Sequence, residues 1–125
     1  MRYIAPKKAY LDSLCGSIVR ARGYCQNPAC HKPISDFNPL VWSHIIPRGY
    51  LHLRWLPENA LCLCFDCERY FTDHPLEQRE LFILVVGEDK YWELKRRSHI
   101  IQKVDYQAVR ESLNQIIKEM KINSY

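Results

Sequence analysis

Residues 57–72 read PENALCLCFDCERYFT, and this segment decides how the rest of the chain is interpreted. It contains Cys64 and Cys67, whose two-residue gap is typical of a tight knuckle that turns two thiolates toward one metal ion. An upstream pair, Cys25 and Cys30, has a looser four-residue gap. Zinc accepts four thiolates in a tetrahedron, and such a site can hold a loop that a small core could not hold alone. The two pairs together predict one structural zinc ion (Zn²⁺).

The other potential ligands leave alternatives for this zinc site. Cys62 alternates with Cys64, so an extended backbone would point both thiols to the same side. His31 directly follows Cys30 and is a second competing ligand. The usual knuckle gap favours Cys64, with Cys62 and His31 left open. The even count of six cysteines also allows disulfides, but clustered cysteines in a reducing cytosol more often bind metal.

The composition indicates one globular domain over residues 1–125, because 47% hydrophobic and 12% aromatic residues are typical of a packed core. No apolar run approaches the ~20 residues that span a bilayer. The N-terminal MRYIAPKK lacks the apolar stretch of a secretory signal. We therefore expect a cytoplasmic protein without membrane contact.

Charge is distributed unevenly along the chain. Residues 1–54 carry eight Lys or Arg and two acidic residues, whereas residues 55–87 carry two Arg and six acidic residues. A basic segment beside an acidic one suits a polyanionic partner that is held next to a cation-binding pocket.

Hydrophobic periodicity predicts a mostly helical chain with little strand. The β-branched, apolar run VWSHII favours a strand over residues 41–46. Gly23 and Gly87 are suited to end helices, and Pro75 is suited to begin one. Helices are expected over residues 7–22, 65–72, 75–86, 88–98 and 105–121, and residues 50–57 are expected to be extended or irregular.

The segments around the cysteine pairs resemble the HNH endonuclease motif. The resemblance rests on His44 at the end of a short strand, Asn59 five residues before the Cys64 knuckle, and a helix that begins at that knuckle. The flanking segments IVRARGYC, SHIIPRGYLHLRW, ENALCLC and TDHPLE are similar to one phage-associated branch, the NinG/Rap recombination nucleases and their bacterial relatives. The resemblance covers about residues 10–120 and is specific over residues 25–80.

The resemblance implies a fold as well as a function. The expected fold class is α+β and mostly helical, with a zinc-stapled ββα-metal (HNH) core over about residues 23–86. An N-terminal helix would precede this core, and a helical extension over about residues 88–122 would follow it. The implied function is metal-dependent cleavage of DNA, with branched recombination DNA as the substrate. A bacterial cytoplasm is the implied compartment, and a homodimer is one option for the assembly.

The resemblance also implies a role for each residue of the constellation. His44 would be the general base, since a histidine can take a proton from water near neutral pH. Asn59 would hold the loop and orient the histidine, and Arg48 and Arg54 would bind DNA phosphates. Mg²⁺ or Mn²⁺ would neutralise the charge of the reacting phosphate.

The catalytic metal ligands are where the sequence departs from the motif. Many HNH enzymes have Asp or His just before the base, where this chain has Ser43. Many also have His directly after the last cysteine and again four residues on, where this chain has Glu68 and Thr72. Glu68 can replace a histidine as a ligand for a hard cation, and His74 could also approach the metal.

Ordinary structural readings of the single residues and two other functions compete with the endonuclease hypothesis. His44 could be an ordinary hydrogen-bonded core histidine, Asn59 a turn cap, and Arg48 and Arg54 solvated loop charges. The second function is that of a zinc-stapled DNA-binding protein with a degenerate, inactive site, which Ser43 and Thr72 favour. A zinc-ribbon adaptor that binds protein through its C-terminal helices is the third reading, and it leaves the motif spacing to chance.

Overall fold

The computed structural model describes residues 5–35 and 39–123, and the fold is α+β and mostly helical. None of the helices in these residues is both long and apolar enough to span a bilayer. In chain order the elements are α1 (Lys8–Arg20), β1 (Leu40–His44), α2 (Leu51–Arg54), the 3₁₀ helix η1 (Pro57–Asn59), β2 (Ala60–Cys64), α3 (Phe65–Thr72), α4 (Pro75–Val86), α5 (Glu88–Ser98) and α6 (Tyr106–Asn123).

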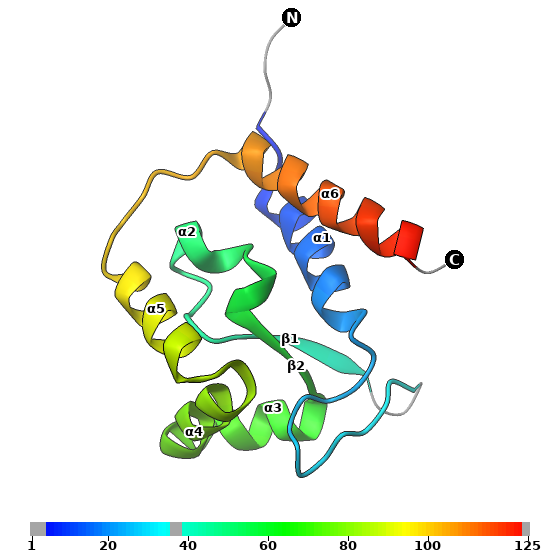
Figure 1. Cartoon of the computed structure of the whole chain (residues 1–125), viewed down its shortest axis with the longest axis vertical. Helices are drawn as coiled ribbons and strands as arrows, with labels where there is room; N and C mark the ends of the chain where they lie inside the picture. Colours follow the sequence, from blue (N-terminus) through cyan, green and yellow to red (C-terminus); the bar gives the residue numbers. More distant parts are fainter. Residues whose placement is uncertain (1–4, 36–38, 124–125) are drawn as a thin grey trace, which may run out of the picture.

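The two strands form a small antiparallel sheet at the centre of the chain (Figure 1). Leu40 lies opposite Cys64, and His44 lies opposite Ala60. Helix α3 begins at the residue after β2. The order is therefore strand, strand, helix, and a long connection that contains α2 and η1 joins the two strands. Because side chains alternate along a strand, His44 and the residue two before it share one face of the sheet.

Helices cover both faces of this sheet, and the apolar side chains form a separate core cluster on each face. On one face, Val19 of α1 packs with Leu40, Ala60 and Cys62. On the other face, Leu61 and Leu63 of β2 share a core with side chains from α3, α4 and α5. The helical members of that core are Phe71, Leu81, Phe82, Tyr91 and Leu94. Helix α5 is therefore packed into the same core as β2.

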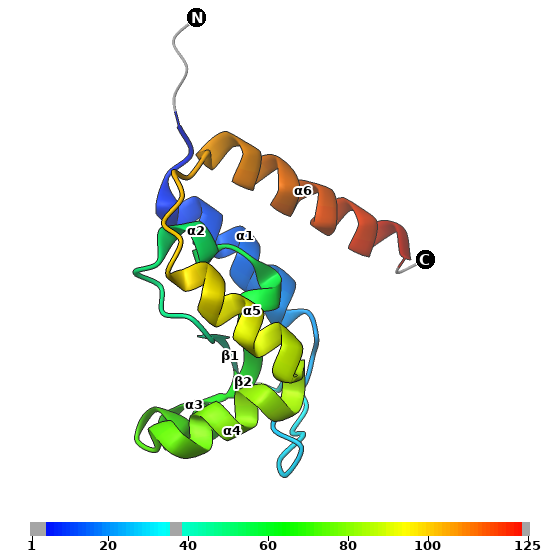
Figure 2. The same ribbon diagram turned by 60° about the vertical axis from the view of Figure 1, so that its left-hand side comes forward.

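The first and last helices of the described chain pack together, and α6 lies along α1 (Figures 1 and 2). Leu113 of α6 is buried against Leu11, Cys15 and Ile18 of α1. Burial also raises the pKa of the Cys15 thiol to about 12, so Cys15 is a core thiol without reactivity near neutral pH. Helix α6 thus covers the apolar stripe of α1 that faces away from the sheet.

The predicted helices are confirmed to within two residues at each end, but the expectation for residues 50–57 is wrong. That segment contains α2 and the start of η1, because Leu53 and Trp55 turn inward and are buried. The predicted strand over residues 41–46 also ends earlier, at His44. The backbone N–H of Ile46 bonds to the side chain of Asn59 instead of to a strand partner, which ends the ladder.

Candidate metal centre and histidine site

Four cysteine thiols meet where the loop after α1 contacts the junction of β2 and α3. The sulfur atoms of Cys25, Cys30, Cys64 and Cys67 all lie within 4.8 Å of one another. Cys64 ends β2 and Cys67 lies in the first turn of α3, so the knuckle is built at the strand–helix junction. Four thiols so placed could hold a metal ion such as zinc, which takes four thiolate ligands.

A short turn brings Cys30 back toward the knuckle. The N–H groups of Cys30 and His31 both donate to the carbonyl of Asn27, at 2.9 and 3.0 Å. The Asn27 side chain accepts from Ala29 N–H and donates to the Cys67 sulfur at 3.4 Å. His31 adopts a positive φ of 53°, which few non-glycine residues do, and so closes the turn. Asn27 therefore both shapes the turn and supports a thiol.

The structure leaves Cys62 and His31 outside this group of thiols. Cys62 is fully buried against Val19 of α1, on the opposite side of β2 from its neighbours in the strand. The ring of His31 instead stacks on Tyr24, with 5.4 Å between the ring centroids. Cys64 belongs instead to the core that β2 shares with α3, α4 and α5, so Cys62 and Cys64 pack in different clusters.

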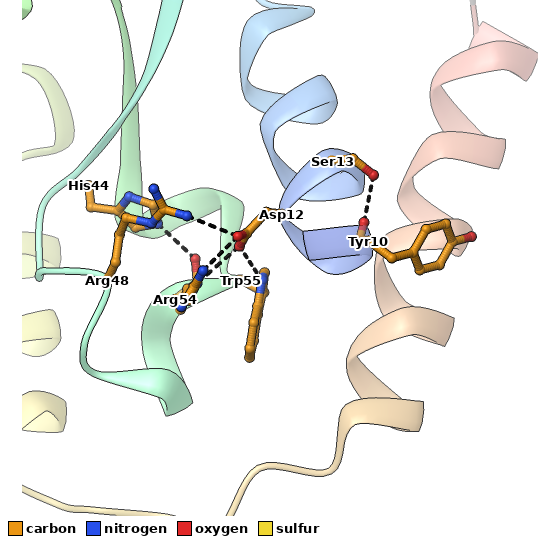
Figure 3. A network of polar contacts seen from close by, with 7 residues as sticks. All are labelled: Tyr10, Asp12, Ser13, His44, Arg48, Arg54 and Trp55. Atoms are coloured by element: carbon orange, nitrogen blue, oxygen red, sulfur yellow. Dashed lines mark hydrogen bonds and ion pairs between the residues drawn. The ribbon is translucent and has the colours of Figure 1, made fainter. Parts of the chain in front are cut away.

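His44 ends β1, half-buried, with one ring nitrogen held by the backbone. Its Nε2 lies 3.0 Å from the carbonyl oxygen of Arg54 (Figure 3). Because a carbonyl only accepts, Nε2 carries the proton, and Nδ1 is left as the acceptor nitrogen of the neutral ring. The ring of Trp42 packs beside it, at 4.2 Å between centroids.

The surroundings of His44 favour its neutral form. Burial lowers the pKa of His44 below its ordinary value, and the positive charges of Arg48 and Arg54 lower it further. The hydrogen bond to the Arg54 carbonyl and the charge of Asp12 act in the opposite direction, but they do not outweigh burial. The imidazole can therefore accept a proton at neutral pH.

Asn59 ties the two ends of the loop between the strands together. Its side chain is fully buried; Oδ1 accepts from Ile46 N–H at 2.8 Å, and Nδ2 donates to the carbonyls of Ile46 and Leu53, both at 3.1 Å. Ile46 follows His44 closely, and Leu53 directly precedes Arg54. Asn59 therefore holds the histidine and its carbonyl partner in a fixed relation.

Replacing Asn59 with Ala is expected to lower the free energy of unfolding by about 2–4 kcal/mol. The reason is that the buried N–H of Ile46 loses its hydrogen-bond acceptor. Urea denaturation measures this loss. Asn114→Ala is the matched control, since Asn114 is exposed on α6, and it is expected to change stability by less than about 0.5 kcal/mol. Equal stability of the two variants would contradict the structural role of Asn59.

The two predicted phosphate ligands are both paired with an aspartate on α1. The guanidinium of Arg54 donates to both carboxylate oxygens of Asp12, at 3.0 and 2.6 Å (Figure 3). Arg48 donates to one of them at 2.9 Å, and the indole N–H of Trp55 donates to the other at 2.8 Å. Burial raises the pKa of Asp12, but these hydrogen bonds and charges outweigh it, and its pKa lies below the ordinary value.

Sequence reasoning missed Asp12. The residue lies 36 positions before Arg48, and only the tertiary packing of α1 brings it there. The one trace in the sequence is that Asp12 is one of two acidic residues in an otherwise basic N-terminal segment.

The two predicted ligands of a catalytic cation have different surroundings. Glu68 is in the first turn of α3, and its Oε2 is buried without a hydrogen-bond partner among the described residues. His74 is exposed, its Nδ1 lies 2.6 Å from the carbonyl of Tyr70, and its ring stacks on Tyr70. Over residues 5–35 and 39–123 the cysteines make up the one group of three or more potential metal ligands, so Glu68 and His74 do not form such a group with His44.

Comparisons with known proteins do not extend this picture. The chain matches no protein-family model, and it has no significant match among curated proteins or solved structures.

Proposed function

We propose that this protein is a metal-dependent DNA endonuclease of the HNH type, in which His44 is the general base. The observation that carries the proposal is the state of His44: a neutral imidazole with Nε2 held by a carbonyl, beside two arginines. Hydrolysis of a phosphodiester needs a proton acceptor for water and positive charge for the phosphate, and this corner of the molecule supplies both.

In the proposed reaction His44 Nδ1 takes a proton from water as the water oxygen bonds to phosphorus. The bond from phosphorus to the leaving 3′ oxygen then breaks, and that oxygen is finally protonated by solvent. A bound Mg²⁺ or Mn²⁺ would neutralise charge on the phosphate and the leaving oxygen. Glu68 is the residue that would hold such a cation, because its buried, unpartnered carboxylate oxygen is a hard donor that suits these ions.

The remaining parts of the proposal rest on the cysteine group for zinc and on the resemblance in the sequence for the substrate, the compartment and the assembly. Zinc bound by the four cysteines would hold the junction of β2 and α3 against the loop after α1. The similarity to phage recombination nucleases favours branched DNA as the substrate, a bacterial cytoplasm as the compartment and a homodimer as the assembly. His74 is a less suitable cation ligand than Glu68, because its ring is engaged with Tyr70.

A second candidate function is DNA binding without catalysis. It is favoured by one observation: within the described residues no group of three potential ligands surrounds His44. The chain would then keep the zinc site and the basic N-terminal segment but would lack a catalytic cation. The two candidates differ in one outcome: with a divalent cation, an endonuclease cleaves DNA, whereas a DNA-binding protein binds it without cleavage.

Replacing Glu68 with Ala is expected to lower cleavage about 10- to 100-fold at 1 mM Mn²⁺ and to be partly rescued as the cation concentration rises. The reason is that a lost ligand weakens cation affinity but leaves His44 in place. Asp66→Ala is the matched control, because Asp66 is an exposed carboxylate in the same helical turn. Cleavage curves that coincide for the two variants at every cation concentration would exclude Glu68 as the ligand.

A further inference from the structure

The carboxylate of Asp12 sits in a cage of donors that resembles a phosphate-binding site. Its Oδ2 accepts from both Arg48 and Arg54, and its Oδ1 accepts from Arg54 and Trp55. Arginine forks bind carboxylates and phosphates with the same geometry. Asp12 therefore occupies the anion position beside His44, as the convergence of the side chains in Figure 3 shows.

The two arginines are held to very different extents. The Arg54 side chain is 16% exposed, bonds to both oxygens of Asp12 and lies over the Trp55 ring at 5.2 Å. The Arg48 side chain is 57% exposed and makes one bond to Asp12. A bidentate, largely buried pair is costly to break, whereas a single exposed pair contributes little. Arg48 can leave Asp12 easily and Arg54 cannot.

Asp12 also determines where the partner of His44 lies. Arg54 is the last residue of α2, a helix of four residues. Its carbonyl oxygen accepts the hydrogen bond from His44 Nε2–H. The bonds from Asp12 to Arg54 and Trp55 anchor this end of α2 to α1. A shift of α2 would move the carbonyl and release the ring of His44.

We infer that Asp12 is a positioning residue that divides the two arginines between two tasks. It locks Arg54 so that the Arg54 carbonyl orients His44, and it is exchanged for a DNA phosphate by Arg48, which lies over Trp42 next to the histidine. The catalytic half of this inference rests on the proposed function, and the binding half does not. Of the two arginines, Arg48 alone contacts DNA.

Asp12→Asn separates this inference from simpler ones, because it is expected to move binding and cleavage in opposite directions. DNA affinity should rise about two- to fivefold, the equilibrium effect of one exposed ion pair, since Arg48 no longer leaves a partner behind. Cleavage should fall about 10- to 100-fold, as it does when an outer partner of an active-site group is lost. Ser13→Ala, on the same helix, is the control and should change neither.

The opposite signs make every outcome decisive. A purely inhibitory Asp12 would give tighter binding and faster cleavage, and a purely structural one would give weaker binding and slower cleavage. Either result, or no change in both, overturns the inference. Affinity is measured for a labelled four-way junction and a duplex without added divalent cation.

The arginines are tested by the salt dependence of the same binding. Arg48→Ala should lower the slope of log affinity against log salt by about one, whereas Arg54→Ala should leave it unchanged. Arg79→Ala is the control for a general loss of charge, because Arg79 lies on α4 and its guanidinium lies over the ring of Trp92 on α5. Equal slope losses for Arg48→Ala and Arg54→Ala overturn the division even where Asp12→Asn does not fold.

A spectroscopic readout keeps the positioning half testable without cleavage. In ¹⁵N NMR the wild-type ring of His44 should be the Nε2–H tautomer, and Asp12→Asn should make the tautomers mix. The charge of Asp12 on α1 raises the pKa of His44, and the charges of Arg48 and Arg54 lower it. Removal of the Asp12 charge should therefore lower the pKa of His44 further. An unchanged His44 spectrum overturns the inference, whereas a wild type that cuts no DNA refutes the proposed function alone.

Discussion

His44→Ala is expected to reduce DNA cleavage by at least about 10²-fold, the usual contribution of a general base, while DNA affinity and Tm stay close to the wild-type values. The reason is that the variant removes the proton acceptor but leaves the zinc site, Arg48 and the Asp12–Arg54 pair in place. Initial rates on a labelled junction, with affinity measured in parallel, separate the chemical step from binding.

The chain offers a closely matched control in His52. Its Nε2 lies 2.8 Å from the carbonyl of Arg97, so His52→Ala also loses one bond between an imidazole and a backbone carbonyl. It should likewise keep Tm close to the wild-type value, and it should keep cleavage within about twofold. A His44→Ala protein that cuts as fast as the His52→Ala protein would exclude the base.

The pH dependence of cleavage follows from the same residue. Burial lowers the pKa of His44, so the ring stays neutral and active below the pH at which an ordinary histidine, with a pKa of about 6.5, becomes protonated. The wild-type rate should therefore hold steady through neutrality and fall only at more acidic pH. A rate that falls already above pH 7 would assign the base to another group.

Cys64→Ser is expected to release the metal and unfold the β2–α3 junction. Structural zinc binds zinc-finger peptides with about 10–16 kcal/mol of apparent free energy, which is comparable to the about 5–15 kcal/mol of stability of a typical fold. Metal analysis should find about one zinc per wild-type chain and much less in the variant, and circular dichroism should show the loss of structure.

Cys62→Ser is the control, because Cys62 is equally buried two residues earlier in β2 but lies outside the thiol group. It should keep its zinc and lose about 1–3 kcal/mol, as expected for a buried hydroxyl. Freshly purified wild-type protein without zinc would contradict the metal assignment, and equal zinc loss in both variants would contradict the choice of ligands.

The helices were predictable because their signals are local. Pro75 and Gly87 bracket α4, and the apolar spacing of α3 and α6 is readable within one segment. The short helix α2 was not, because LHLR has no cap and folds through the burial of Leu53 and the bond from Asn59. Tertiary packing, not propensity, decides such a segment.

The candidate site was predictable only in part. Spacing was enough to single out the four cysteines, since ligands of one ion must lie close together. It was not enough to show that Arg54 is buried against Asp12, because the sequence carries no record of contacts between distant helices. The same limit applies to Cys62, which packs against Val19 of α1 and lies outside the group of four thiols.

The proposed function requires that the protein cut DNA with His44 and a divalent cation. The most direct test incubates zinc-loaded wild-type protein with duplex, single-stranded, flap and four-way-junction DNA, with Mg²⁺, with Mn²⁺ and without added divalent cation. We expect cation-dependent cuts, fastest on the branched substrates and absent without the cation. Binding of these DNAs with no cut on any of them, at any cation concentration, would contradict it and establish DNA binding without catalysis.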